Sequence, residues 1–194
     1  MATYFYDEAL VEKLKSWRAD TQLQILGPDE TRRLFEVIAD NTKDEPIKLP
    51  IVCLTRRSGY SILSTGKKPM TFDGLTKEAT VPHSMQINAI PISLSYQIDV
   101  YTRYYKEADE FARNIIFNII NSPSIEIVLP YNSVDLVHKS NIRIASEVED
   151  NSNIAERLVP GQFTRLTFVI DIDDAYLFDL RFRHNYIIEA NVEY

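Results

Sequence analysis

The side chains with the clearest chemical potential form a carboxylate cluster near the end of the chain. Asp171, Asp173 and Asp174 close a hydrophobic, strand-like run. Carboxylates at the end of a strand can hold Mg²⁺ or Mn²⁺, so a divalent-metal enzyme is one interpretation of this cluster. Strand alternation alone also puts Asp171 and Asp173 on one polar face. We therefore favour a solvated or subunit-facing surface over a metal site.

The remaining reactive side chains form no recognisable catalytic motif. The three histidines, His83, His138 and His184, are far apart, and none has metal-ligand spacing from another. The sequence has no G-x-S-x-G, no phosphate-binding glycine loop and no H-E-x-x-H. The single cysteine, Cys53, lies within a β-branched run, where a buried apolar role is expected. The pattern favours a binding or assembly protein without a cofactor.

A basic and aromatic stretch occupies residues 101–106 (YTRYYK), including Tyr101 and Arg103. Such a stretch can stack nucleic-acid bases, or it can cover the end of a sheet where a strand turns into a helix. We favour the second interpretation because the chain is acidic. It has 28 acidic and 21 basic residues, and residues 145–194 carry ten of the acids against four bases. Binding nucleic-acid phosphates requires clustered Lys and Arg.

The overall composition is that of an ordinary globular chain. It has 194 residues, of which 45% are hydrophobic and 25% charged, enough for one well-buried core. One cysteine excludes a disulfide framework within the chain. Neither a leader-like N-terminal segment nor an apolar run of about 20 residues is visible, so we expect a soluble, intracellularly made protein.

Hydrophobic periodicity predicts a single α+β domain over residues 1–194. The expected architecture is a mostly antiparallel or mixed sheet, packed by one long amphipathic helix over about 105–121. Two short helices are expected in the N-terminal segment 1–45, and an extended loop over 64–84 carries Lys67, Lys68 and Lys77. Strands are expected at 48–55, 60–63 (paired with the first through a turn at 58–59), 90–100, 124–129, 141–149, 163–173, 176–181 and 186–192.

The order of these pieces resembles the tail terminator, or proximal tail sheath stabilisation, proteins of T4-type contractile-tailed bacteriophages. The similarity runs from about residue 4 to residue 178 as scattered matches in the right order. The most specific part is the alternating strand that ends in residues 101–104 (YTRY) and leads directly into the long helix. The other matches are residues 4–6 (YFY), 48–52 (KLPIV), 142–144 (IRI) and 165–169 (RLTFV) before the acidic turn.

The resemblance implies a structural virion protein without catalytic residues or cofactor, made in the host bacterial cytoplasm. Six copies would form a ring on the last tail-tube and sheath rings, end tail polymerisation and meet the neck or connector proteins. DNA would pass through the lumen without specific binding, and no membrane would be involved. Two alternatives stay open: another neck or head-completion ring protein, and the metal enzyme. Interface residues are expected at Lys67, Lys68 and Lys77 (neighbouring subunit or tube), at Tyr101 and Arg103, and at Asp171, Asp173 and Asp174 (lumen or subunit boundary).

Overall fold

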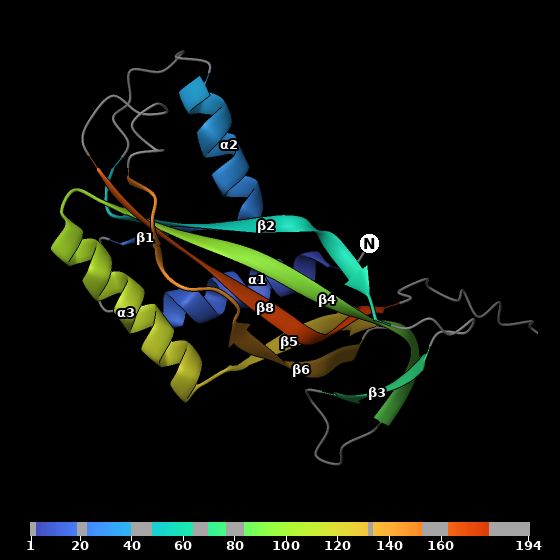
Figure 1. Cartoon of the computed structure of the whole chain (residues 1–194). Coiled ribbons are helices and arrows are strands. Elements are labelled where there is room, and N and C mark those ends of the chain that lie inside the picture. The colour runs from blue at the N-terminus through green and yellow to red at the C-terminus, as the bar shows by residue number, and fades with distance from the viewer. Residues whose placement is uncertain are drawn as a thin grey trace, which may run out of the picture.

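A computed structural model shows three helices and a large, mostly antiparallel sheet, as the periodicity predicts (Figure 1). It describes residues 3–18, 23–39, 48–63, 70–76, 84–131, 134–152 and 163–178. None of the helices within these ranges combines the length and apolar character needed to cross a membrane. The elements are α1 (Tyr4–Ser16), β1 (Gln24–Leu26), α2 (Pro28–Ala39), β2 (Ile51–Ile62), β3 (Met70–Thr76), β4 (Ser84–Thr102), α3 (Tyr105–Asn121), β5 (Ser124–Tyr131), β6 (Val134–Ile144), β7 (Glu149–Asp150) and β8 (Thr164–Phe178).

The long strand β4 is the centre of the sheet. It pairs antiparallel with β2 along one edge and with β8 along the other. Its side chains alternate between the two faces as predicted: the apolar positions of residues 92–100 are all fully buried. β4 nevertheless begins at Ser84, earlier than predicted, and its first residues pair with β3.

At the β3 end the sheet curls on itself. β4 pairs with β3, β3 with β6, β6 with β8, and β8 again with β4, so these four pairings form a closed cycle. β5 extends the curled part by pairing with β6 in a hairpin. Within the described strands β5 has no other partner, which leaves it as an edge strand.

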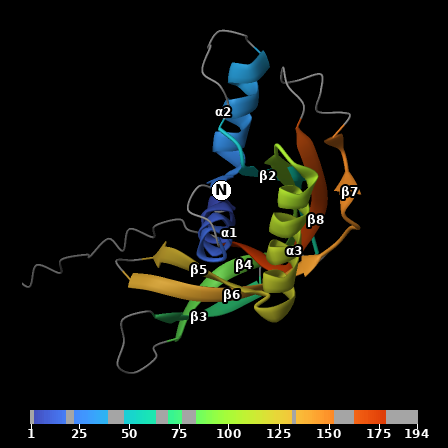
Figure 2. The same cartoon turned by 90° about the vertical axis from the view of Figure 1, so that its left-hand side faces the viewer.

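The helices cover both faces of the sheet. Buried side chains of α1 and α3 share one core with the alternating apolar residues of β4 and β8. Figure 2 shows α2 set apart from α3. α2 covers the β2 end of the opposite face, where the buried Thr31 side chain lies against Cys53. Pro28 begins α2, as predicted, because a residue without an N–H costs nothing in the first turn.

A polar contact ties α1 to the sheet. The Tyr96 hydroxyl of β4 donates a hydrogen bond to the Asp7 carboxylate of α1 at 2.7 Å. The Arg56 guanidinium of β2 bonds the same carboxylate and also donates to the Thr3 hydroxyl at 3.0 Å. The start of α1 is therefore fixed to β2 and β4 by charge as well as by its apolar face.

Several predicted boundaries are wrong. Residues 48–63 do not form a hairpin, because β2 runs continuously through the predicted turn and absorbs it as an irregularity between Arg56 and Tyr60. The predicted loop 64–84 contains β3 in its middle, since pairing with β4 stabilises a segment with weak periodicity. The predicted strand 141–149 is instead the end of β6, which starts at Val134. β1 was not predicted, and the predicted strand 186–192 lies outside the described residues.

Candidate functional site

The carboxylates of Asp171 and Asp173 do lie together, as alternation predicts, and they converge on one arginine. Arg143 of β6 donates through Nε to Asp173 at 2.9 Å and through Nη2 to Asp171 at 3.1 Å. Arg143 and Asp171 are direct cross-strand partners, which explains the pairing. These two carboxylates raise the pKa of the exposed Arg143 guanidinium. The cluster therefore carries one compensating positive charge that sequence reasoning did not assign to it.

Asp174 lies beside a β-bulge and has a different partner from this pair. β8 places both Asp173 and Asp174 between the residues that pair with Ile92 and Leu94 of β4. The Asp174 side chain instead accepts a hydrogen bond from the backbone N–H of Asn141 at 2.7 Å. The three aspartates thus do not converge. Among the described residues no group of three or more His, Cys, Asp or Glu is placed to hold a metal ion.

A histidine–serine pair lies inside the curled end of the sheet. Nε2 of His138 is 2.8 Å from Oγ of Ser140, and both groups contact the backbone carbonyl of Asp174. Ser140 is fully buried and His138 is 7% exposed, among the rings of Tyr176 and Phe178. Burial lowers the pKa of His138. A buried hydroxyl cannot meet a substrate, so this geometry serves to join β6 to the β8 bulge.

A second buried polar cluster lies on the sheet face that α2 partly covers. The Asp99 carboxylate is 2% exposed and accepts hydrogen bonds from Thr167 at 2.6 Å, Arg165 at 3.1 Å and Gln97. Arg165 also lies over the Tyr101 ring, 5.6 Å from its centre. No sequence pattern indicates that Asp99 is buried, because its strand position is on the polar side of the alternation.

The basic and aromatic stretch divides between buried and exposed side chains. Tyr101 is partly buried, and its ring contacts Phe163 at a centroid distance of 5.8 Å. This geometry fits the interpretation that Tyr101 covers the end of the sheet. Arg103 is exposed on the short link to α3, followed by Tyr104 and Tyr105, which are 66% and 57% exposed. The side chains of these three residues lie in solvent and are accessible to a partner.

Cys53 has the buried role expected from the sequence. Its side chain is fully buried beneath α2, and burial raises the pKa of its thiol to about 12. A thiol with that pKa is protonated at neutral pH and is a poor nucleophile or metal ligand.

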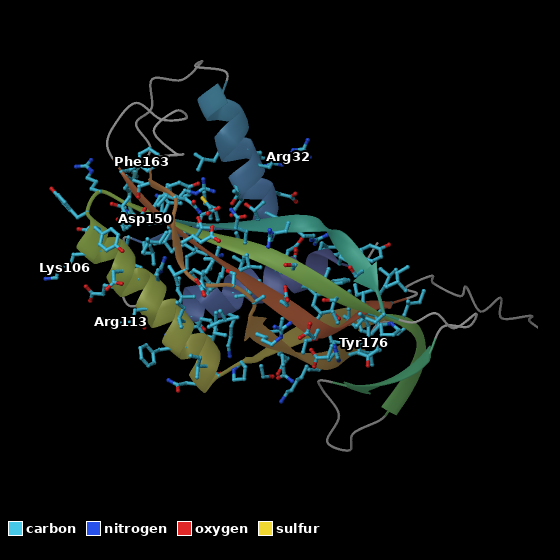
Figure 3. The ribbon with its side chains drawn as sticks, in the orientation of Figure 1. Arg32, Lys106, Arg113, Asp150, Phe163 and Tyr176 are labelled. Carbon is cyan, nitrogen blue, oxygen red and sulfur yellow. The ribbon has the colours of Figure 1, made fainter. Side chains whose placement is uncertain are left out.

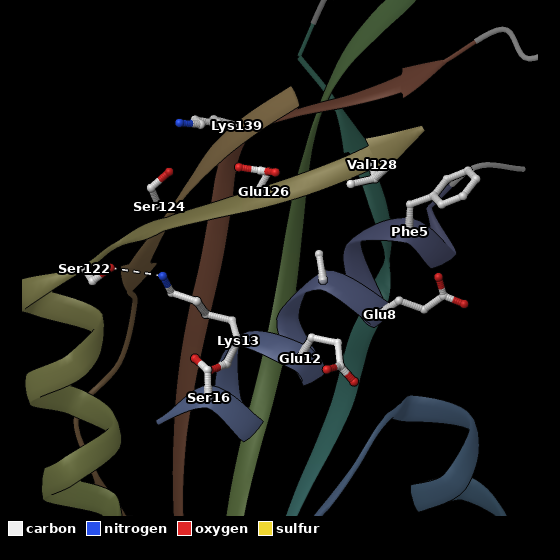
Figure 4. Close-up of a pocket in the computed structure, with 11 residues that line it drawn as sticks. Phe5, Glu8, Glu12, Lys13, Ser16, Ser122, Ser124, Glu126, Val128 and Lys139 are labelled. Carbon is white, nitrogen blue, oxygen red and sulfur yellow. Dashed lines mark hydrogen bonds between the residues drawn. The ribbon is translucent and has the colours of Figure 1, made fainter. Parts of the chain in front are cut away.

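A groove lies between α1 and β5 (Figure 4). Its volume is about 570 Å³. At one end Lys13 of α1 donates a hydrogen bond to the Ser122 hydroxyl at 3.0 Å. No sequence motif marked this groove, because it is formed by two segments more than a hundred residues apart. Its lining residues are Phe5, Glu8, Ala9, Glu12, Lys13, Ser16, Ser122, Ser124, Glu126, Val128 and Lys139.

The predicted interface residues do not form one site. Tyr101 faces Arg165 across the β4–β8 pair, whereas Asp171 faces Ser95, six residues further along the strand and roughly 20 Å away. Figure 3 shows Tyr176 of β8 towards one end of the sheet, and Asp150 and Phe163 towards the other. Of the other predicted interface residues, Lys67, Lys68 and Lys77 lie outside the described residues, as do His83 and His184.

No protein-family model matches the chain, and no curated protein is significantly similar to it.

Proposed function

We propose that this chain is a tail terminator of a T4-type contractile phage tail. Six copies would form a ring that caps the tail tube and the sheath and meets the neck. The observation that carries the proposal is the unit formed by β4 and α3. Its alternating strand, its YTRY ending at residues 101–104 and its immediate entry into an amphipathic helix are the features that most resemble the family.

The surface chemistry supports an assembly role. Phe117 and Ile120, one turn apart on α3, are 58% and 63% exposed. Large apolar side chains in solvent are typical of surfaces that another chain covers. β5 is an edge strand, and edge strands bridge neighbouring subunits readily.

The charge distribution supports a lumen through which DNA moves. Glu147, Glu149, Asp150 and Asp173 are all exposed on the part of the molecule formed by β7 and β8. An acidic surface repels phosphates and therefore does not retain a passing duplex. In the ring we place Asp171, Asp173 and Asp174 near the lumen or a subunit boundary; a ring structure with all three on its outer rim would refute this placement.

The function is tested on tail ends. Gold-labelled protein is mixed with headless contractile tails of T4-type phages and examined by electron microscopy. We expect label at one end of each tail and a block to further tube and sheath growth. Label along the whole tail would contradict a terminator. Label on isolated portal or connector complexes instead would assign the chain to the neck or the head-completion rings.

A further inference from the structure

The outer edge of β5 has free backbone hydrogen-bonding groups. The Ile142 N–H donates to the Pro123 carbonyl at 2.8 Å, which fixes the phase of the β5–β6 ladder. In an antiparallel ladder alternate residues bond the partner strand, and those between them point away. Ser124, Glu126 and Val128 therefore direct their N–H and C=O groups away from β6. Among the described residues no hydrogen bond uses these groups.

The same three residues line the groove between α1 and β5. Their side chains form one wall, and the outward side of α1 forms the other. The groove lies beside these residues, and its volume of about 570 Å³ is enough for a short extended peptide. Pro130 ends the usable edge because it is the next outward-facing position and has no N–H. The geometry is that of a sheet edge ready to accept one more strand.

The chain itself contains a segment with the pattern of such a strand. Within residues 186–192, Ile188, Ala190 and Val192 alternate with Glu189 and Asn191. Tyr186 continues the apolar set, and Ile187 is the one apolar residue between its members. Period-2 alternation is the signature of a strand with one apolar face. The residues between Phe178 and this segment span up to roughly 25 Å when extended, far enough to reach an adjacent molecule.

The end of β8 lies near this groove. Phe5 at the groove is next to Tyr6 of α1, whose hydroxyl accepts a hydrogen bond from the N–H of Tyr176. The groove lining carries charges of both signs, with Glu8, Glu12 and Glu126 against Lys13 and Lys139.

We infer that residues 186–192 of one copy add as a strand to the β5 edge of a second copy. This contact is directional, from the C-terminal segment of one subunit to the groove of the next, so its repetition closes a ring rather than a two-fold dimer. The inference rests on the proposed ring, for which it supplies the subunit contact.

Photo-crosslinking of the full chain tests the occupant of the groove. Benzoylphenylalanine replaces the exposed Glu126, and the control probe replaces Glu110, which is exposed on α3. ¹⁵N-labelled and unlabelled copies are mixed before irradiation. We expect crosslinks from position 126 to residues 186–192 that join labelled to unlabelled peptides, and none of these from position 110. Crosslinks only within one copy, crosslinks to other segments, or no crosslink would each overturn the inference.

A matched pair of variants tests the backbone contact. Glu126→Pro and Glu126→Ala both remove the carboxylate, but only proline removes the outward N–H, and neither touches the bonds to β6. With equal thermal stability, we expect Glu126→Pro to weaken subunit association by about tenfold or more and Glu126→Ala to leave it nearly unchanged. A ring that persists equally in both variants would overturn the strand contact while leaving the proposed function intact.

Discussion

Replacing Asp99 by alanine should destabilise the fold strongly, because it leaves a buried cation without its counter-charge. Asp99 is 2% exposed and the Arg165 side chain 15%, and the two are joined at 3.1 Å. Thr167 and Gln97 lose their acceptor in the same substitution. Removing one partner of a buried ion pair costs about 3–5 kcal/mol, since the remaining charge stays desolvated.

We expect a smaller loss of folding stability when the unpaired charge of Arg165 is removed as well. Arg165→Met in the Asp99→Ala background replaces the guanidinium by an apolar chain of similar length. We expect the double variant to recover roughly 1.5 kcal/mol or more, because a buried pair replaced by apolar residues is often neutral. Asp99→Asn should fall between wild type and alanine, since its one oxygen still accepts hydrogen bonds from Arg165 and Thr167.

Urea denaturation measures these differences. Trp17 is the only tryptophan and lies where α1 meets α3, with its carbonyl bonded to Asn114, so its fluorescence reports global unfolding. With a slope of about 2 kcal/mol per molar urea, a loss of about 3 kcal/mol lowers the midpoint by about 1.5 M. A loss below about 1 kcal/mol for Asp99→Ala, or a double variant less stable than the single one, would refute the reasoning.

Four further outcomes are expected. The pKa of His138 is lowered in the folded state, so the unfolded chain binds the proton at higher pH than the folded chain does. The free energy of unfolding should therefore fall as the pH drops below about 6.5. Urea titrations at several pH values measure this dependence, and His138→Gln should remove it. Cys53 should not react with a thiol reagent at neutral pH in the native protein and should react fully in denaturant. Tyr96→Phe should cost about 2 kcal/mol by the same urea assay, since it removes a hydrogen bond to the Asp7 carboxylate. Calorimetric titration with Mg²⁺ or Mn²⁺ should give no saturable binding; saturable heat that Asp173→Asn abolishes would restore the metal-enzyme interpretation.

The elements with strong periodicity were predictable from the sequence. The alternation in β4 and the three-to-four spacing of the apolar residues in α3 each follow from one buried face, and one face is enough to fix the type of element. Pro28, followed by Asp29 and Glu30, fixed the start of α2 through local chemistry alone. In each case the information lies within the segment itself.

Features that depend on distant segments were not predictable. Asp99 reads as a solvent-facing residue because alternation separates two faces but does not say that the second face is also covered. Ser58 and Gly59 read as a turn, yet β4 is long enough to pair on both sides of them and keeps β2 continuous. The groove requires the packing of α1 beside an edge strand, a contact that no local pattern encodes.

In the candidate site, too, the features that lie within one strand were predictable, and those that depend on a second strand were not. Alternation correctly placed Asp171 and Asp173 together, because the two residues share a strand. It gave no position for Asp174, which lies beside a bulge that depends on the pairing of β8 with β4. It also could not supply Arg143, whose position opposite Asp171 is set by the register of β6.

Native mass spectrometry of the purified protein, combined with electron micrographs of the same sample, tests the central claim most directly. The proposed function predicts a species of six subunits that is seen as an annulus. A chain that stays monomeric over the whole accessible concentration range, and that also forms no annulus on the ends of contractile tails, would contradict it.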